Sequence, residues 1–234
     1  IDRPKIEVEK KILSKKIKNK NILITGGGGS IGSALCLEIL KHNPKKLYIL
    51  DNSEISLYNI LKKVESIKAL SNKKFNFILG DCSDIDFLLQ KFKLVKIDDI
   101  YHAAAYKHVG FGEENLYSII KNNILGTKSV LELGIIKKVK NFIFVSTDKA
   151  VNPKSVLGYT KKIGECLVNI YSKKKNINKK TRFTVVRFGN VIGSSGSVIP
   201  LFLDQIKKTK PLTVTHKNVK RYFMSISEAV QLII

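Results

Sequence analysis

Tryptophan is absent from this sequence, methionine occurs once, and cysteine occurs three times among 234 residues. The three cysteines, Cys36, Cys82 and Cys166, lie in separate segments, which excludes a disulfide framework and the paired spacing of a zinc site. Scattered thiols of this kind are typical of a reducing, cytoplasmic setting. No apolar run reaches the roughly 18 residues that a membrane-spanning helix needs.

Acidic residues are also scarce, because 19 aspartates and glutamates stand against 42 lysines and arginines, for a net charge of +23. Clustered lysines could indicate a nucleic-acid surface. The lysines are instead spread over the whole chain, no aromatic residues alternate with them, and no nucleic-acid module is recognisable. We therefore expect a solvated lysine-rich surface and no nucleic-acid partner. Its positive field would attract a substrate that carries a diphosphate.

The order of apolar segments predicts an α/β domain with a doubly wound parallel sheet covered by helices on both faces. After a charged lead-in over 1–20, we expect strands at 21–25, 46–51, 75–79, 98–105, 141–147 and 182–188. Helices are expected at 30–41, 54–70, up to 92, 115–136 and 155–171. Residues 21–188 would form this domain. Residues 189–234 would begin a substrate-binding region, with a helix at 201–210, a short strand at 211–215 and a helix from Ser227.

A glycine-rich turn follows the first expected strand in ILITGGGGSIG. Gly26, Gly29 and Gly32 allow a sharp turn, a close approach of backbone to a pyrophosphate, and packing of the next helix on the strand. Ser30 and Ile31 open that helix, whose free N–H groups and partial positive charge would face the phosphates. A glycine-rich turn with a purely structural role is the alternative, and the strand before it, the helix after it and the acid beyond make that alternative less favoured. The pattern therefore predicts a Rossmann-type dinucleotide site.

Asp51 ends the second expected strand, about 20 positions beyond the glycines, where such sites place an acid. A carboxylate there accepts the two ribose hydroxyls and repels a 2′-phosphate. No arginine follows within 51–60 to reverse that preference. The sequence therefore favours NAD over NADP.

A dense polar segment, STDKAVNP, follows the fifth expected strand directly. Thr147, Asp148 and Lys149 place a hydroxyl, a carboxyl and an amine at one edge of the sheet. A simple turn, with Asp148 as a cap and Lys149 in solvent, is the alternative that local chemistry alone supports.

Six segments together resemble the extended short-chain dehydrogenase/reductase superfamily: ITGGGGSIG, YHAAAYKHV, STDKAVNP, GYTKKIGE, VRFGNVIGSSGSVIPLF and RYFMSISEAVQL. Within it the chain looks like the nucleotide-sugar 4,6-dehydratases of polysaccharide biosynthesis (the capsule and flagellin glycan family), which act on UDP-N-acetylglucosamine. The resemblance covers 21–234. Members of one branch carry membrane helices before this domain, and this chain starts without methionine and stops within a helical pattern. We therefore expect a fragment whose parent is anchored to the cytoplasmic side of the inner membrane.

The resemblance implies a redox-neutral reaction that yields a UDP-4-keto-6-deoxy-N-acetylhexosamine. A tightly held NAD removes hydride from C4 of the sugar, water leaves across C5–C6, and the hydride returns to C6. By resemblance, Lys149 is the base at C5, Asp148 is the acid at the C6 hydroxyl, and Thr147 bonds the C4 oxygen. Such roles require a lowered pKa for Lys149 and a raised pKa for Asp148.

One position departs from the superfamily pattern. The usual Tyr-x-x-x-Lys pair falls on Leu157 and Lys161, and Leu157 has no hydroxyl group. Tyr159 lies roughly 200° around the helix from Lys161, so it is not a simple substitute. The membrane-anchored branch commonly has methionine at this position, which leucine replaces with little change of shape. Leu157 is therefore compatible with activity if another group deprotonates the C4 hydroxyl.

Further site residues follow from the resemblance alone. Lys161 would hold the nicotinamide ribose, Asp81 would meet the adenine, and Ala103 and Ala104 would lie against the cofactor. The sugar nucleotide would face three residues: Lys107, Asn190 and Arg221. Arg221 is equally consistent with a surface ion pair. His102 and His108 have no partners at ligand spacing, so no metal site is predicted.

Two other functions remain open at this stage. The first is a 4-epimerase or another sugar-nucleotide dehydratase of the same superfamily, although an epimerase needs no acid for a C6 hydroxyl. The second is a non-catalytic nucleotide-sugar binder in which Leu157 marks lost chemistry. A homo-oligomer paired through the helices at 115–136 and 155–171 is expected by resemblance.

Overall fold

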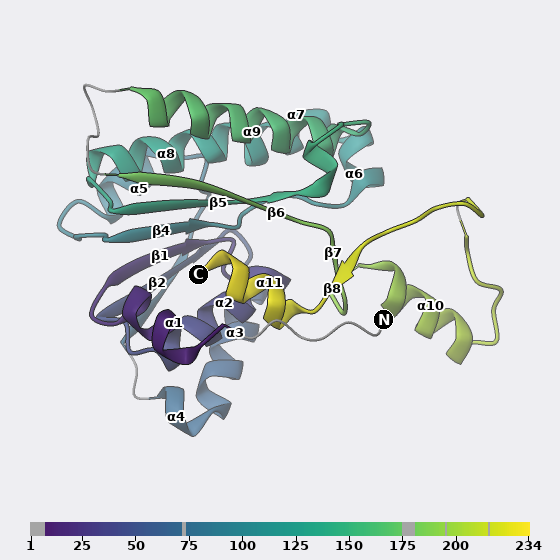
Figure 1. The fold of residues 1–234 in the computed structure, drawn as a ribbon, viewed down its shortest axis with the longest axis horizontal. Coiled ribbons are helices and arrows are strands. Elements are labelled where there is room, and N and C mark those ends of the chain that lie inside the picture. The colour runs from purple at the N-terminus through teal and green to yellow at the C-terminus, as the bar shows by residue number, and fades with distance from the viewer. Residues whose placement is uncertain (1–7, 72–73, 175–180, 195, 215) are drawn as a thin grey trace.

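A six-stranded parallel sheet forms the centre of the molecule (Figure 1). The computed structural model describes residues 8–71, 74–174, 181–194, 196–214 and 216–234. The sheet has the order β3-β2-β1-β4-β5-β6. The chain adds strands outward from β1 to β3, then crosses back and adds β4, β5 and β6 on the other side of β1. This is the doubly wound arrangement that the sequence predicts. Its strands are β1 (Asn21–Thr25), β2 (Lys46–Asp51), β3 (Phe75–Leu79), β4 (Asp99–His102), β5 (Asn141–Thr147) and β6 (Arg182–Phe188).

Alternate residues of each strand enter two separate cores, one on each face of the sheet. In β1, Ile22 and Ile24 belong to one core and Leu23 to the other. The first core is covered by α1 (Lys10–Ile17), α2 (Ser30–Lys41), α3 (Glu54–Ser66) and α11 (Ile226–Ile233). The second is covered by α5 (Ile85–Lys91), α8 (Gly126–Ile136) and α9 (Val156–Lys173). Burial on both faces explains why the central strands β1, β2 and β5 are largely apolar.

Side-chain caps fix where several helices begin. Ser53 accepts a hydrogen bond from the Ser56 N–H at the start of α3, and Asp84 does the same for Phe87 at α5. Ser155 caps α9 by accepting from Gly158. Such caps stabilise a helix by about 1 kcal/mol each. The observed bounds of α2, Ser30–Lys41, confirm the sequence prediction.

Several expected elements differ in the structure. The strand expected over 98–105 ends at His102, and the helix expected over 201–210 spans Val198–Lys207. The helix expected over 54–70 is broken at Ile67, which is extended, and a short α4 (Lys68–Ser71) then turns Leu70 into the core. The helix expected over 115–136 consists of α7 (Leu116–Ile120), a π-helical turn η1 (Lys121–Leu125) and α8. Residues 211–214 form no strand, because no described strand pairs with them; residue 215 lies outside the described part.

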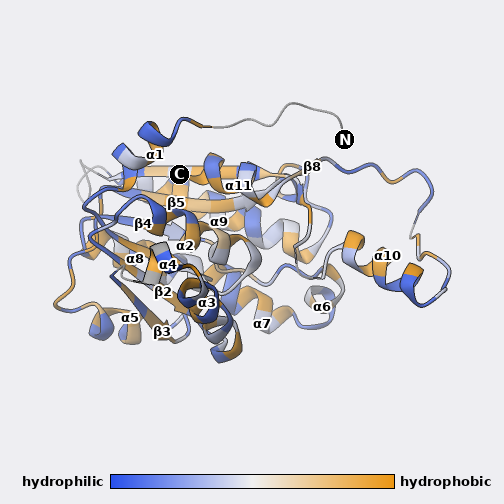
Figure 2. Ribbon diagram, turned by 90° about the horizontal axis from the view of Figure 1, so that it is seen from below, coloured by the Kyte–Doolittle hydropathy of each residue, from blue (hydrophilic) through white to orange (hydrophobic). Residues whose placement is uncertain are grey.

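The chain leaves the sheet after Phe188 and forms a smaller unit at the carboxyl ends of the strands (Figure 1). There β7 (Asn190–Val191) pairs in parallel with β8 (Phe223–Met224). Between them α10 (Val198–Lys207) stands away from the sheet, with apolar and polar residues on different sides (Figure 2). The capping box of Ser225 and Glu228 then starts α11, which returns to the first core. Within the described residues, no helix has the length and apolarity needed to cross a membrane.

Candidate active site

The glycine-rich turn between β1 and α2 is packed too tightly for any side chain. A Cβ on Gly32 would lie 1.9 Å from the Gly26 carbonyl oxygen, and a Cβ on Gly26 would lie 2.5 Å from the Ala104 Cα. Gly26 also has a φ of +69°, a conformation that L-residues rarely adopt. Gly26, Gly29 and Gly32 also line the larger cavity described below, so backbone without side chains faces it there. That is the shape a pyrophosphate needs.

Asp51 lies at the end of β2, where its carboxylate holds the rim of the turn. One oxygen accepts from the Gly28 N–H at 2.9 Å and the other accepts from the Ser53 N–H at 3.0 Å. Asp51 also lines a cavity of about 230 Å³ together with Gly29 and Ala104. The sequence-predicted acid and glycines thus meet in one place.

Asp81 lies beside this smaller cavity rather than in its lining, which includes its neighbours Gly80 and Cys82. Its carboxylate accepts from the Ser83 N–H at 2.8 Å and lies 3.7 Å from the Lys121 ammonium. The predicted contact of Asp81 with adenine stays a prediction.

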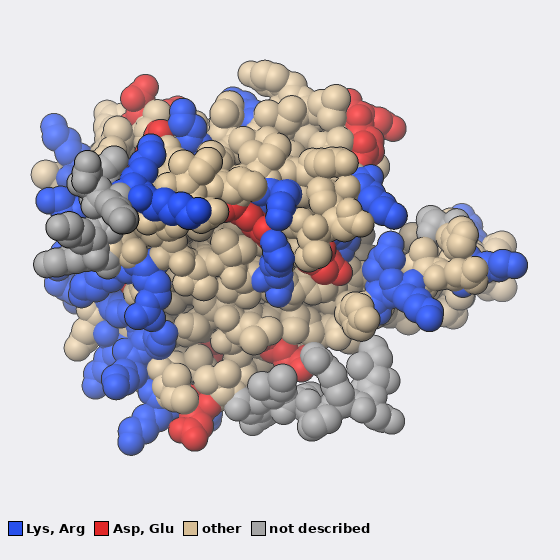
Figure 3. Space-filling view, turned by 45° about the horizontal axis from the view of Figure 1, so that its top comes forward, with Lys and Arg blue, Asp and Glu red and all other residues tan. Residues whose placement is uncertain are grey.

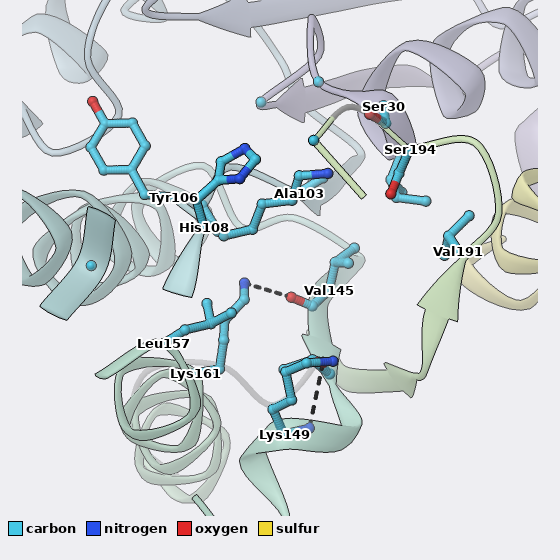
Figure 4. A pocket seen from close by; sticks show the side chains of 18 of the residues that line it. Ser30, Ala103, Tyr106, His108, Val145, Lys149, Leu157, Lys161, Val191 and Ser194 are labelled. Atoms are coloured by element: carbon cyan, nitrogen blue, oxygen red, sulfur yellow. Dashed lines mark hydrogen bonds between the residues drawn. The ribbon is translucent and has the colours of Figure 1, made fainter. Parts of the chain in front are cut away.

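A larger cavity of about 870 Å³ adjoins the smaller one at the carboxyl ends of the strands. Gly26, Gly29, Ala103 and Tyr106 line both cavities, so the two meet in front of the glycine turn. Lys149, Leu157 and Lys161 face the larger cavity from the opposite side (Figure 4). A volume of this size is suitable for a small organic ligand.

Thr147, Asp148 and Lys149 are joined by hydrogen bonds where β5 ends and the 3₁₀ turn η2 (Asp148–Ala150) begins. The Thr147 hydroxyl donates to Asp148 Oδ1 at 2.9 Å, and the Lys149 ammonium donates to the same oxygen at 3.0 Å. Lys149 also donates to Asn190 Oδ1 at 3.0 Å. Lys149 therefore bridges the end of β5 and the start of the C-terminal unit.

The charge state of Asp148 differs from the one that the family resemblance requires for catalysis. Partial burial acts to raise the pKa of Asp148, but the hydrogen bonds from Lys149 and Thr147 outweigh it and leave the pKa below its usual value. Asp148 is therefore a carboxylate that accepts from the Lys149 ammonium. The raised pKa expected for Asp148 is not found.

Lys161 lies one helical turn after Leu157 on α9, and both line the larger cavity (Figure 4). Its ammonium donates to the Val145 carbonyl oxygen at 2.7 Å and lies 4.5 Å from the centre of the Phe144 ring. Burial lowers the pKa of Lys161 to about 8. Tyr159 is 56% exposed and is not part of the cavity wall, as its position on the helix predicts.

The three residues predicted to face the sugar nucleotide separate into two groups. Lys107 and Asn190 line the larger cavity. Partial burial of the Lys107 ammonium lowers the pKa of this residue. Arg221 is exposed and outside the cavity wall, where its guanidinium donates to the Lys220 carbonyl oxygen at 2.8 Å. The structure therefore does not bring Arg221 to the other two.

His102 is fully buried between β1 and α8, as a structural residue would be. Its Nδ1 lies 2.6 Å from Thr25 Oγ1 and its Nε2 lies 3.0 Å from Thr127 Oγ1. Thr127 gives its only hydroxyl proton to the Asn123 carbonyl oxygen, so Nε2 donates to Thr127 and Nδ1 accepts from Thr25. Burial lowers the pKa of His102 to about 3, which agrees with a neutral ring. No group of three or more potential metal-binding side chains occurs in the described residues.

Two groups of side chains that hold the site in place were not predicted from the sequence. Asn123, on the π-helical turn η1, exchanges hydrogen bonds with the Tyr106 backbone and donates to the Thr160 hydroxyl at 3.1 Å. Ser146 donates to Glu165, which also forms a bidentate pair with Arg187. Only the spacing of Glu165, four residues after Lys161 on one helix face, signalled this second group in the sequence.

Curated relatives of this chain are involved in polysaccharide and nucleotide-sugar metabolism. It is 43% identical over 235 residues to the capsular polysaccharide biosynthesis protein CapD of Staphylococcus aureus, covering 100% of this chain and 38% of CapD. It is 40% identical over 218 residues to the UDP-glucose 4-epimerase of Rickettsia bellii, covering 92% of this chain and 62% of that enzyme. The chain thus spans less than two thirds of either relative.

Solved structures with the same fold include nucleotide-sugar enzymes. Pen from Bacillus thuringiensis is 35% identical with a TM-score of 0.85, over 93% of this chain and 64% of Pen. The UDP-glucuronic acid 4-epimerase of Bacillus cereus, in complex with UDP-glucuronic acid and NAD, is 26% identical with a TM-score of 0.74, over 90% of this chain and 71% of the epimerase. Residues 22–234 match the family described as polysaccharide biosynthesis protein. With these relatives, the match shows that the chain belongs to that family.

Proposed function

We propose that this chain carries the active site of an NAD-dependent 4,6-dehydratase that acts on UDP-N-acetylglucosamine. The observation that carries the proposal is that Thr147 and Lys149 lie on the wall of a cavity that begins at the glycine turn. Asp148 lies just outside that wall, hydrogen-bonded to both of them. An acid, a base and a hydroxyl side by side match an elimination of water next to a ketone. The family and its relatives support a nucleotide-sugar substrate.

The residues around the glycine turn fit NAD. Gly26 and Gly32 leave the backbone open to a pyrophosphate, Asp51 stands where the adenosine ribose would lie, and Lys161 faces the nicotinamide end of the cavity. NAD would supply a hydride acceptor at C4 of the sugar and a hydride donor at C6. Asp51 would exclude a 2′-phosphate by charge repulsion.

Lys149 and Asp148 can reach their catalytic charge states by moving one proton along an existing hydrogen bond. In the open cavity, Lys149 donates to Asp148 Oδ1 at 3.0 Å, as an ammonium to a carboxylate. When a sugar fills the cavity and displaces water, the neutral forms of both groups are favoured, because a low dielectric disfavours separated charges. The same transfer then leaves a neutral amine as the base at C5 and a protonated Asp148 as the acid at the C6 hydroxyl.

The Thr147 hydroxyl, at the end of β5, would bond the C4 oxygen of the sugar by turning its proton away from Asp148. Leu157 contributes no hydroxyl to the cavity, so deprotonation of the C4 hydroxyl falls to the polar groups that remain. Lys161, whose pKa burial lowers to about 8, keeps a positive charge against the cavity at neutral pH. That charge would stabilise a developing alkoxide on C4.

A 4-epimerase is the second candidate, because the Rickettsia bellii relative bears that name. An epimerase needs neither an acid at C6 nor a base at C5. The direct contact of Lys149 with Asp148 therefore favours the dehydratase.

The mass of the product distinguishes the two reactions. The protein would be incubated with NAD and UDP-N-acetylglucosamine, and the sugar nucleotide analysed by mass spectrometry. A dehydratase gives a product lighter by one water and no net NADH. A product of unchanged mass that co-elutes with UDP-N-acetylgalactosamine would replace the dehydratase with the epimerase. Saturable binding of the sugar nucleotide without any product would establish a non-catalytic binder instead.

A further inference from the structure

Exposed lysines occur on several turns at one edge of the sheet. In a doubly wound fold, all the strands start at the edge opposite the ligand site, and the crossover helices end there. Exposed lysines stand on the turns that lead into four of the strands: Lys45 before β2, Lys74 before β3, Lys93 and Lys96 before β4, and Lys138 and Lys140 before β5. We call these six residues the amino-edge patch. Figure 3 shows lysine and arginine gathered at this end of the molecule, on the left of the view.

The opposite edge has a different charge. The opposite ends of the strands carry acids beside their lysines, with Asp51 as the last residue of β2, Asp81 and Asp84 after β3, and Asp148 after β5. On the described turns of the amino edge the acid is Asp98, which is 8% exposed and lies 3.4 Å from Lys140. The described turns of the amino edge therefore carry lysines without an exposed acid, whereas the turns of the opposite edge carry both signs of charge.

An apolar side chain stands out of this basic edge. Leu94, on the turn between α5 and β4, is 95% exposed, while its neighbour Phe92 is completely buried and fixes the turn. Lys137 at the end of α8 donates to the Lys93 carbonyl oxygen at 2.9 Å, so the two turns lie together. Ile136 precedes that lysine and is 55% exposed. Apolar tips among lysines are typical of proteins that rest on a lipid surface.

We propose that the amino-edge patch, with Leu94 at its centre, docks on the surface of an anionic phospholipid bilayer. Positive charge complements the lipid headgroups, and Leu94 would enter the boundary with the acyl chains. The cavities at the opposite edge of the sheet would then face the aqueous phase, where a nucleotide sugar diffuses. This inference does not depend on the reaction proposed above.

Nucleic acid is a less suitable partner for this edge. Binding of single strands uses exposed aromatic side chains for base stacking, and the aromatic residue on these described turns, Phe92, is buried. Helices α5, α8 and α9 also end at this edge, and the partial negative charge of their C-terminal carbonyl groups disfavours tight phosphate binding. Diffuse lysine charge with an exposed leucine matches lipid better than a phosphate backbone.

Sedimentation with lipid vesicles tests the proposal. The protein is mixed with vesicles of phosphatidylcholine alone, or of equal parts phosphatidylcholine and phosphatidylglycerol. We expect binding to the mixed vesicles only, weakening with added salt because the attraction is screened within about 10 Å at 0.1 M. Equal binding to both vesicles, or to neither, would overturn the proposal. So would tight binding to polyuridylate without binding to mixed vesicles.

Matched variants locate the surface. The triple change Lys93→Gln, Lys96→Gln and Lys138→Gln should reduce binding to mixed vesicles by more than about tenfold. The control triple removes the same charge at the other end of the molecule: Lys207→Gln, Lys210→Gln and Lys217→Gln. It should retain most of the binding, and an equal loss in both triples would mean that net charge alone is responsible. Unchanged NAD affinity and melting temperature would show that both triples are folded.

Leu94→Ser gives an independent test because it leaves the charge unchanged. Binding to mixed vesicles should fall roughly threefold or more, since the apolar contact is lost. The matched control is Leu203→Ser on α10, where the leucine is 54% exposed at the far end. Equal behaviour of the two serine variants would contradict a specific role for Leu94.

Discussion

The hydrogen bond between Lys149 and Asp148 is the centre of the proposed mechanism. Lys149→Ala would remove the proposed base at C5, so turnover should fall by roughly 10²–10⁴-fold. NAD affinity should stay the same, because Lys149 is not part of the smaller cavity. Lys154→Ala is the control, since Lys154 is exposed and lies five residues on. Rates of product formation and NAD titrations check both statements, and equal rates in the two variants would remove Lys149 from the mechanism.

Protonation of the single residue His102 makes the free energy of unfolding depend on pH. Its pKa of about 3 in the folded protein lies below the unfolded value near 6.5. The unfolded chain therefore binds more protons, so this contribution to stability is complete above about pH 6.5 and is lost as pH falls toward 3. Between about pH 7 and pH 5 it should reduce the free energy of unfolding by about 2 kcal/mol.

Urea unfolding at the two pH values measures this loss. His102→Gln keeps a donor and an acceptor but cannot titrate, so its stability should change less between the two values than that of the native protein. His216→Gln changes an exposed histidine and should behave like the native protein. An identical pH dependence in all three proteins would show that His102 does not titrate in this range.

At the scale of elements, the turn between β1 and α2 has the strictest steric requirement. Gly32→Ala would bring a Cβ to 1.9 Å from the Gly26 carbonyl oxygen, so the turn would have to move. We expect a loss of about 1–3 kcal/mol in stability and weaker NAD binding. Gly110→Ala, on α6 (Val109–Glu114), meets nothing within 4 Å and should leave both unchanged. Urea unfolding and NAD titration of the two variants check this difference.

Local signals predicted most elements well. The sheet strands and α2 follow from runs of apolar residues and from the glycines that end them. The break at Ile67 was not predictable, because it depends on where Leu70 must point to reach the core. The π-helical turn η1 was also missed, since Asn123 holds it through contacts with Tyr106 and Thr160, which are distant in sequence.

The candidate site was predictable where the topology alone brings residues together. Asp51 and the glycines meet because parallel strands end at one edge, and Lys149 follows the same rule. Arg221 does not, because it lies on the segment between α10 and β8, which no strand order fixes. Predicting the Glu165–Arg187 ion pair would have required the register of β6 against β5, which a single sequence does not show.

At the scale of the whole molecule, bound NAD should stabilise the fold by mass action. At about 100 times the dissociation constant, the gain is about 2.7 kcal/mol, measured as a higher melting temperature. NADP should give a smaller gain because Asp51 repels the 2′-phosphate. Asp51→Ala should reduce the NAD effect and narrow the difference between the cofactors, whereas exposed Asp86→Ala should not. A larger shift with NADP than with NAD in the native protein would contradict the role of Asp51.

The dehydratase mechanism is tested most directly at one carbon atom. The reaction with NAD and UDP-N-acetylglucosamine would be run in D₂O and followed by proton NMR. Removal of the C5 proton by Lys149 and its replacement from solvent predict a 4-keto-6-deoxy product with deuterium at C5. A 4-keto-6-deoxy product that keeps its original C5 proton, or an epimer without deuterium, would contradict the assignment of Lys149 as the base.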